Sequence, residues 1–311
     1  MDYFRTSSKT KMRNLTSILR KSVPACLLAL LLSGISPIGE IRAEEGAGVS
    51  GTWHRTDEAA VRLIAGRHEL DENGQIQLGV QIRLKPGWKT YWRNPGESGA
   101  PPRFDWDTSG NLDSVELRWP APVRFSAFGF DSFGYHDEVV LPVLLRASSA
   151  TKPLLARLHL EYMICAQVCI PIQAKLALNL APSGQQGTDG AATASAFAPL
   201  IRHYLKLVPQ AADKSGLKIE SARVSGPPGK QILHIQGHSN RPFLAPDLMV
   251  EGPEPFGFGR PEITYGAGRR DVALALPIFA GPGRAILANQ ALNLTLVDGN
   301  RAIEQRLTPG S

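Results

Sequence analysis

The fold is decided by Tyr162-Met163-Ile164-Cys165-Ala166-Gln167-Val168-Cys169-Ile170-Pro171-Ile172-Gln173, which joins two segments with the pattern of β-strands. Residues 157–162 and 175–180 alternate between apolar and polar side chains, as strands with one buried face do. Cys165 and Cys169 therefore lie in a strand connection. A disulfide needs Cα atoms roughly 4.4–6.8 Å apart, and an extended Cys-x-x-x-Cys would separate them by about twice that distance. Only a turn could pair the sulfurs, and Pro171 helps to fix where the chain leaves it.

Residues 1–43 have the composition of an export signal. A leader with several Lys and Arg residues precedes a short apolar core at 25–32, which is too short to span a bilayer. Ile41-Arg42-Ala43 then offers a cleavage site before Glu44. Cys26 comes before most of the apolar core, which argues against a lipoprotein anchor, and an uncleaved amphipathic anchor is the remaining alternative. We expect a signal peptide cleaved near Ala43 and a mature, periplasmic chain without a membrane span.

Removing this leader changes the charge balance. The whole chain carries a formal charge of +6, but residues 1–43 hold seven of its 34 basic and two of its 28 acidic side chains. The mature chain keeps 27 basic and 26 acidic residues. Because its basic and acidic residues are nearly equal in number, the mature chain gives no reason to expect nucleic acid or an anionic membrane as a partner.

Short alternating runs punctuated by Gly and Pro fill the rest of the chain. They lie at residues 76–84, 114–119, 139–146, 154–163 and 175–180, and then at 217–224, 231–237, 248–251, 272–278 and 292–297. Many short strands without a strong helical pattern predict an all-β protein. We expect a β-sandwich over residues 50–182, a linker over 183–196, and a second, smaller β-sandwich without cysteine or tryptophan over 197–311. One short helix is expected at 197–207, and Asp298-Gly299 should form a hairpin turn.

Two aromatic segments rich in glycine interrupt the first half. Residues 87–99 contain Trp88 and Trp92, and the simpler interpretation is a sandwich core followed by a loop, rather than a surface for a partner or a sugar. Residues 125–137 form a second predicted loop that carries four phenylalanines among small residues. This loop could fold over the cysteine turn and shield a disulfide from stray thiols, or it could simply be buried between the sheets.

Three interpretations compete for Cys165 and Cys169. A structural bridge is usual in exported proteins, yet closing a loop of about five residues stabilises a fold by only about 2 kcal/mol. Zinc would need four ligands, and His234 and His238 are the nearest approach to a second pair. Copper(I) could use both thiolates with Met163. Reversible exchange is favoured on chemical grounds, because a disulfide in so short a loop is easily strained and strain raises its reduction potential. The alternative is a non-catalytic binding module that handles Cu(I) and keeps a structural disulfide.

Several motifs in order resemble one known family. They are Gly87-Trp88-Lys89-Thr90-Tyr91-Trp92-Arg93-Asn94-Pro95-Gly96, Trp119-Pro120-Ala121-Pro122, Val139-Val140-Leu141-Pro142-Val143 and Tyr162…Cys165…Cys169-Ile170-Pro171. Together they resemble, over residues 55–182, the periplasmic N-terminal domain of the thiol–disulfide interchange protein DsbD, and most of all its ScsB-type relatives linked to copper tolerance. Copper tolerance and cytochrome c biogenesis are the processes that this resemblance suggests.

The resemblance implies an immunoglobulin-like sandwich and a redox role. The cysteine pair would pass electrons from a membrane reductase to periplasmic thioredoxin-like partners, without a cofactor or a metal. Cys169 would form the mixed disulfide and Cys165 would resolve it, as in a protein-disulfide reductase. A cap loop with a key phenylalanine would shield the pair: Phe128 is the best match, accompanied by Phe130 and Tyr135, with Tyr162 and Pro171 in support.

The sequence departs from the family pattern in two places. Ser126 and Ala127 stand where the family's cap loop is acidic, and Asp131 is a candidate substitute for the acidic residues. Family members also continue into a transmembrane conduit and a thioredoxin-like domain, and this sequence contains neither. We therefore expect either that a separate membrane protein donates the electrons or that the protein no longer relays them.

Overall fold

The computed structural model describes residues 48–127, 129–184, 194–280, 286–287 and 289–310. The predicted signal peptide, Cys26 within it and most of the predicted linker lie outside these described residues. The segment Glu44–Ser311 forms one compact unit.

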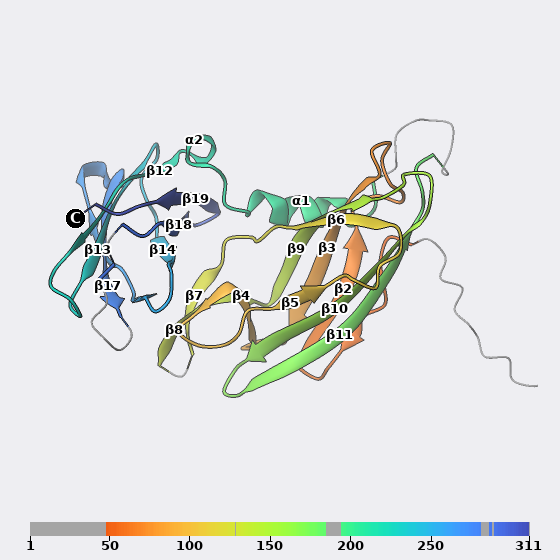
Figure 1. The fold of residues 1–311 in the computed structure, drawn as a ribbon, viewed down its shortest axis with the longest axis horizontal. Coiled ribbons are helices and arrows are strands. Elements are labelled where there is room, and N and C mark those ends of the chain that lie inside the picture. Colours follow the sequence, from red (N-terminus) through yellow and green to blue (C-terminus); the bar gives the residue numbers. More distant parts are fainter. Residues whose placement is uncertain (1–47, 128, 185–193, 281–285, 288, 311) are drawn as a thin grey trace, which may run out of the picture. The chain divides into compact units, whose positions relative to one another are not determined.

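The N-terminal domain is a sandwich of two antiparallel sheets (Figure 1). The first sheet has the order β1-β2-β3-β9-β6, with β1 His54–Arg55, β2 Ala59–Ala65, β3 Gln75–Leu84, β6 Leu112–Leu117 and β9 Glu138–Ala147. The second has the order β11-β10-β4-β8-β7, with β5 paired to β10. Its strands are β4 Lys89–Gly96, β5 Arg103–Asp105, β7 Val123–Ala127, β8 Phe130–His136, β10 Leu154–Cys165 and β11 Cys169–Leu180.

The hairpin β10–β11 confirms the alternation seen in the sequence. Its strands pair at every position from Leu154↔Leu180 to Cys165↔Cys169. The even-numbered residues of β10 are buried in the core, and so are the even-numbered residues of β11 from Ile172 onward. Burial of one face gives the period-two pattern, and the all-β, immunoglobulin-like sandwich follows from it.

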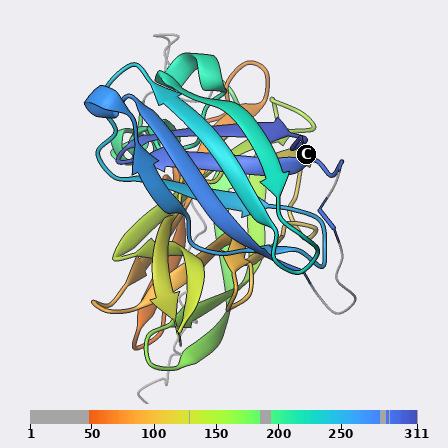
Figure 2. The same cartoon turned by 90° about the vertical axis from the view of Figure 1, so that its left-hand side faces the viewer.

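The C-terminal domain has its own core and two further sheets (Figure 2). The larger sheet has the order β12-β13-β17-β15, with β16 paired to β17; its strands are β12 Leu217–Ser225, β13 Ile232–Ser239, β15 Gly257–Phe258, β16 Glu262–Tyr265 and β17 Asp271–Phe279. The smaller one has the order β14-β18-β19, with β14 Pro246–Glu251, β18 Leu292–Asp298 and β19 Arg301–Leu307. The expected turn after Asp298 joins β18 to β19, and the short helices are α2 Ala212–Ser215 and η1 Ala267–Arg269.

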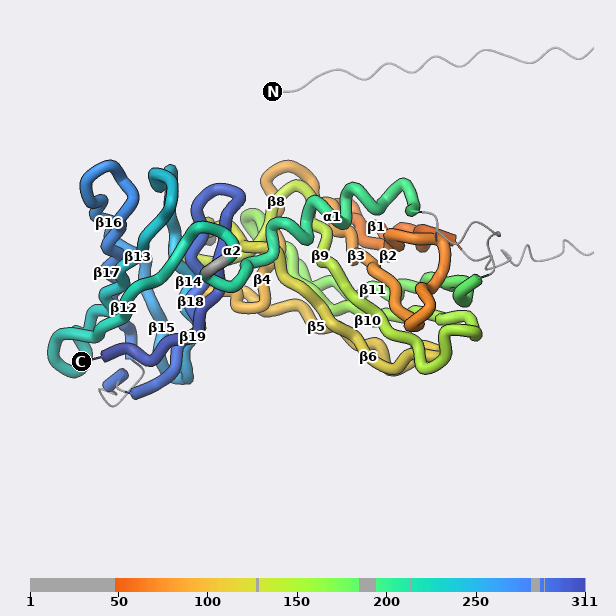
Figure 3. The backbone as a smooth tube through the Cα atoms, turned by 90° about the horizontal axis from the view of Figure 1, so that it is seen from above, coloured from red at the N-terminus to blue at the C-terminus, as the bar shows by residue number. Residues whose placement is uncertain are grey.

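The predicted helix is present as α1 Ala198–Lys206, but it packs on the N-terminal sandwich (Figure 3). Ile201 is buried against Ile64 and Val140, and the Tyr204 hydroxyl donates to the carbonyl oxygen of Glu138 at 2.8 Å. The sequence places this helix in the predicted second domain, residues 197–311, because periodicity alone does not show which sheet an apolar helix face covers.

Strands are present in two segments where the sequence pattern predicts none: residues 87–99, interpreted as sandwich core followed by a loop, and residues 125–137, predicted as a loop. Residues 87–99 contain β4, and residues 125–137 contain most of the hairpin β7–β8. In β4 both Tyr91 and Trp92 are buried, although they point to opposite faces of the sheet. Strands buried on both faces lose the alternation that identifies a half-buried strand, and this is why the pattern missed them. Within the described residues, no helix is long and apolar enough to cross a membrane.

Candidate functional site

The two cysteines form a disulfide at the turn of the longest hairpin. Cys165 ends β10, Cys169 begins β11, and the two residues are register partners with Cα atoms 4.1 Å apart. The amide of Ala166 donates to the carbonyl oxygen of Val168 at 3.0 Å and closes the three-residue turn. A rigid ladder of paired strands therefore carries the sulfurs to the edge of the sandwich.

The two halves of the disulfide differ in exposure. Cys165 is only 2% exposed, whereas Cys169 is exposed, as are the neighbouring Gln167 and Val168. An attacking thiolate must approach one sulfur in line with the S–S bond. Of the two cysteines, Cys169 is the one exposed to solvent.

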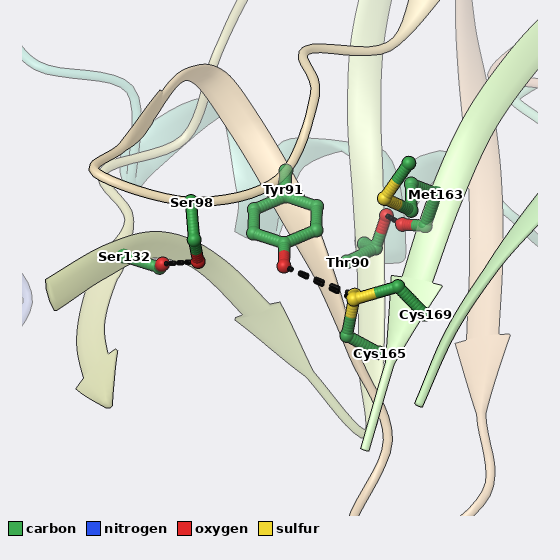
Figure 4. The surroundings of a disulfide bond; sticks show 7 residues. All are labelled: Thr90, Tyr91, Ser98, Ser132, Met163, Cys165 and Cys169. Carbon is green, nitrogen blue, oxygen red and sulfur yellow. Dashed lines mark hydrogen bonds between the residues drawn. A yellow bond between two sulfur atoms is a disulfide. The ribbon is translucent and has the colours of Figure 1, made fainter. Parts of the chain in front are cut away.

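Tyr91 contacts the buried half (Figure 4). Strand β4 pairs with the end of β10 through Ile164↔Thr90 and Cys165↔Lys89. The Tyr91 hydroxyl lies 3.0 Å from Cys165 Sγ and 3.8 Å from Cys169 Sγ. The Thr90 hydroxyl donates to the carbonyl oxygen of Met163 at 2.9 Å, which fixes β4 against β10 at this point.

The environment of Tyr91 keeps its hydroxyl protonated. Burial raises the pKa of Tyr91 above its ordinary value of 10.0, although a hydrogen bond with Ser98 opposes the shift. Gly99 has φ +90°, and a Cβ at this position would overlap the Tyr91 ring. A glycine is therefore needed behind the ring. Tyr91 is a fixed neutral donor aimed at the buried sulfur.

The hairpin β7–β8 lies beside β4 in the same sheet. Phe125 packs on Tyr91 with ring centroids 5.9 Å apart, and the Lys89 ammonium lies 5.2 Å from the centre of the Phe125 ring.

The structure describes two of the three residues predicted to shield the cysteines. Phe128, the best match to a shielding ring, lies outside the described residues. Phe130 is 53% exposed. Tyr135 is part of the core; its hydroxyl donates to the carbonyl oxygen of Pro120 at 2.8 Å, and burial raises its pKa.

The two residues predicted to support the site line one cavity. Tyr162, Met163 and Pro171 border a space of about 220 Å³, which Ala100 and Pro101 between β4 and β5 also line. Burial raises the pKa of Tyr162, and its hydroxyl has no hydrogen-bond partner among the described residues. Met163 and Pro171 are register partners two positions from the cysteines.

The comparisons with known proteins agree with this geometry. Residues 60–181 match the family model described as "Thiol:disulfide interchange protein DsbD, N-terminal". These residues form a DsbD N-terminal domain. The chain is also similar to the crystal structure of the N-terminal periplasmic domain of ScsB from Proteus mirabilis. The TM-score is 0.65 at 25% identity, and the match covers 85% of this chain and 99% of that one.

The second domain matches a different family model. Residues 207–311 correspond to a family described as a domain of unknown function (DUF8393). No curated protein sequence matches the chain. The family of the first domain and the Cys165–Cys169 disulfide identify a thiol–disulfide exchange module.

The histidines considered as metal ligands have other partners in this structure. His234 Nε2 lies 2.8 Å from Ser225 Oγ, and His238 Nδ1 lies 2.7 Å from Asp271 Oδ1. Among the described residues, no three His, Cys, Asp or Glu side chains are grouped so that they could hold a metal ion.

Sequence reasoning missed part of this site. Tyr91, Thr90 and Phe125 were all noted in aromatic segments, but they were assigned to the core or to a loop. Tyr91 and Cys165 are 74 residues apart in the chain, and only the pairing of β4 with β10 brings them together. The motif shared with DsbD N-terminal domains, which contains Tyr91 next to Trp92, was the one available signal.

Proposed function

We propose that this protein passes electrons through Cys165 and Cys169 between a membrane reductase and periplasmic thioredoxin-like proteins. Its export to the periplasm is part of the proposal. Support comes from the DsbD N-terminal family model and from the similarity to a periplasmic domain of ScsB. The observation that carries the assignment of roles is the asymmetry of the pair, in which Cys169 is exposed and Cys165 is buried under Tyr91.

The proposed exchange consists of two thiol–disulfide steps with the partner and the reverse of these steps with the electron donor. In the reduced protein, the Cys169 thiolate attacks a partner's disulfide, forms a mixed disulfide and releases one partner thiolate. Cys165, as the thiolate, then attacks Cys169 Sγ, closes the internal disulfide and releases the second partner thiolate. The partner gains two electrons and takes up two protons. Reduction by the donor runs the same steps in reverse, with a donor thiolate attacking Cys169 and Cys165 leaving.

Tyr91 contributes most when Cys165 is a thiolate. A disulfide sulfur is a weak acceptor, whereas a thiolate accepts a charge-assisted hydrogen bond that is roughly twice as strong as a neutral one. The Tyr91 hydroxyl, 3.0 Å from Cys165 Sγ in the oxidised protein, is placed to donate such a bond as the S–S bond breaks. This stabilises Cys165 both as a leaving group and as a resolving nucleophile.

The first prediction assigns the two cysteines. Cys165→Ser should form a lasting mixed disulfide with a thioredoxin-like protein that carries a single active-site cysteine, activated as its mixed disulfide with thionitrobenzoate. Cys169→Ser should react far more slowly, because its remaining thiol is buried. Released thionitrobenzoate gives the rate, and non-reducing electrophoresis shows the covalent adduct.

A structural disulfide would give another result. Each serine variant would then lose a little stability, and neither would trap the thioredoxin-like protein beyond the level of the Cys165→Ser/Cys169→Ser double variant. The copper alternative is separated by titrating the reduced protein with Cu(I) against a competing chelator. Tight binding that depends on both thiols and on Met163 would favour metal handling over electron transfer.

A further inference from the structure

A cluster of ion pairs joins the hairpin β7–β8 to the second domain. Asp131, at the start of β8, accepts hydrogen bonds from Arg124 at 3.0 Å and from Arg260 at 2.6 and 3.1 Å. Arg124 also donates to both carboxylate oxygens of Asp247, at 2.9–3.2 Å, and to the carbonyl oxygen of Leu248 at 2.9 Å. Arg124 and Asp131 belong to the hairpin, whereas Asp247 and Arg260 belong to the second domain.

The cluster is largely shielded from water on the hairpin side. The side chains of Arg124 and Asp131 are 7% and 16% exposed, and the Arg124 guanidinium also lies 4.8 Å from the centre of the Phe133 ring. Charges removed from water are costly unless each keeps its partner. The hairpin therefore depends on Asp247 and Arg260 to complete the pairing of its own buried charges.

The cluster lies immediately below the tip of the hairpin. Asp131 is the register partner of Ser126, and the following pair, Ala127↔Phe130, is the last pair of the hairpin. Asp131 is also tied to the loop after β4, because its amide donates to Glu97 Oε2 at 2.8 Å. Phe125, one position before Ser126, packs on Tyr91. One short hairpin thus contacts Tyr91, which lies on the disulfide, and also the second domain.

We propose that Arg260 and Asp247 of the second domain hold this hairpin closed and thereby set how fast thiols reach the disulfide. This inference rests on the proposed function and on the expectation from the family resemblance that this hairpin shields the cysteine pair. Arg124, Asp131, Asp247 and Arg260 are positioning residues, because they act on the sulfurs only through the placement of the hairpin. The second domain acquires a task in the exchange reaction although it contains no cysteine.

Other contacts keep the two domains together when this cluster is weakened. Met249 of β14 is buried in the core of the first domain. Arg93 of β4 donates to Glu251 at 2.7 Å and also pairs with Glu304. A change at Arg260, whose side chain is 63% exposed, should therefore loosen the hairpin without detaching the domain. This makes Arg260 the best position to test.

The test measures the rate at which dithiothreitol reduces the disulfide in the full chain. Arg260→Ala should react about twofold to fivefold faster than the wild type, since losing one partly exposed ion pair shifts a closed–open equilibrium by about that factor. Arg260→Lys should retain much of the slow rate. Raising the salt concentration should accelerate the wild type more than Arg260→Ala, because salt screens the ion pair that the variant lacks. Arg223→Ala is the matched control, since Arg223 is an exposed arginine of β12 in the same domain.

Two further readouts separate positioning from a general loss of structure. Amide exchange in residues 123–136 should accelerate in Arg260→Ala while the amides of β12 keep their protection. The reduction potential should stay at the wild-type value, because opening the hairpin changes access to the bond and not the energies of its two redox states.

The results for Phe128→Ala and Arg260→Ala together separate the role of the second domain from shielding by the hairpin. If Phe128→Ala speeds reduction and Arg260→Ala does not, the hairpin shields the disulfide but the second domain does not hold it, and the inference fails. If neither variant speeds reduction, shielding itself fails and the inference fails with it. Faster reduction in Arg223→Ala to the same extent would also overturn it, since the effect would then not depend on Asp131.

Discussion

At the scale of single residues, Tyr91 gives the two sulfurs of the disulfide different hydrogen-bonding environments. Its hydroxyl is closer to Cys165 than to Cys169, and Gly99 leaves room for the ring. A donor on one sulfur favours the thiolate on that side when the bond breaks. The chemistry of the pair is therefore tuned by a residue of a different strand.

Tyr91→Phe tests this role with little change in shape. Without the hydroxyl the reduced state loses a hydrogen bond to the Cys165 thiolate, while the oxidised state loses only a weak one. A difference of about 1–2 kcal/mol would make the reduction potential about 20–40 mV more negative. Equilibration with a glutathione redox buffer measures this shift.

Tyr204→Phe is a control for removing a hydrogen-bonded, half-buried tyrosine hydroxyl, because Tyr204 donates to the carbonyl oxygen of Glu138 on the sheet that does not carry the cysteines. A potential for Tyr91→Phe within a few millivolts of the wild type, or a less negative one, would show that Tyr91 serves packing alone.

At the scale of secondary-structure elements, the hairpin β10–β11 holds the cysteines in place whether or not they are bonded. Its twelve residue pairs run back into the core of the sandwich, and its inward side chains are buried. The hydrogen bonds of the ladder and this burial do not depend on the disulfide at its end.

Reduction of the disulfide should therefore cost little stability. A bridge that closes a loop of about five residues contributes about 2 kcal/mol, which corresponds to a melting temperature lowered by roughly 5–10 °C in a domain of this size. Calorimetry of the oxidised and reduced protein tests this, with the Cys165→Ser/Cys169→Ser double variant as the reference for the reduced form. A collapse of amide protection throughout β10 and β11 on reduction would contradict it.

The elements also show where sequence reasoning succeeds. The strands β10, β11 and β17 were predicted because each has one face in a core and a more exposed opposite face. The strand β3 was predicted because its sequence alternates, although Gly79 and Gln81 on its other face are buried as well. The spacing of Cys165 and Cys169 within one strand connection was enough to identify the pair. In contrast, β4 and β8 have consecutive buried residues and glycines, so their pattern has no period of two. The donor Tyr91 lies on such a strand, and contacts between distant strands leave no local trace in the sequence.

At the scale of the whole molecule, two cores belong to one compact unit. Each domain has its own cluster of buried side chains, and Met249 of the second domain packs into the cluster of the first. The contact between them is also electrostatic, through Arg93, Arg124, Asp131 and Arg260. The boundary residues 183–196 and the separate folding of residues 197–311 stay predictions.

The stability that Asp131 contributes should depend on pH. Hydrogen bonds from Arg260, together with the charge of Arg124, lower the pKa of Asp131 below its ordinary value of 3.8. A lowered pKa means that the stabilisation is fully present above the unfolded value and is lost as the pH falls through the folded one. Asp131→Asn should therefore be less stable than the wild type by about 1–2 kcal/mol near neutral pH, and the difference should disappear in strong acid.

Urea denaturation at a series of pH values measures this difference. Asp113→Asn is the matched control, because Asp113 is an exposed aspartate of β6 with no ion pair among the described residues. A stability gap between Asp131→Asn and the wild type that stays constant into strong acid would refute the assignment, since it would not follow the charge of Asp131.

The unequal burial of the two sulfurs also bears on oxidative damage. In the reduced protein a peroxide meets Cys169 first, because Cys165 is covered. The product at Cys169 would be a sulfenic acid, and the thiol of Cys165 can condense with it to release water and form the disulfide. That product is the disulfide form seen in this structure, which under the proposed function an electron donor would reduce again. The buried Cys165 thiol would thus convert an oxidised Cys169 into a reducible disulfide before it can be oxidised further to irreversible sulfinic acid.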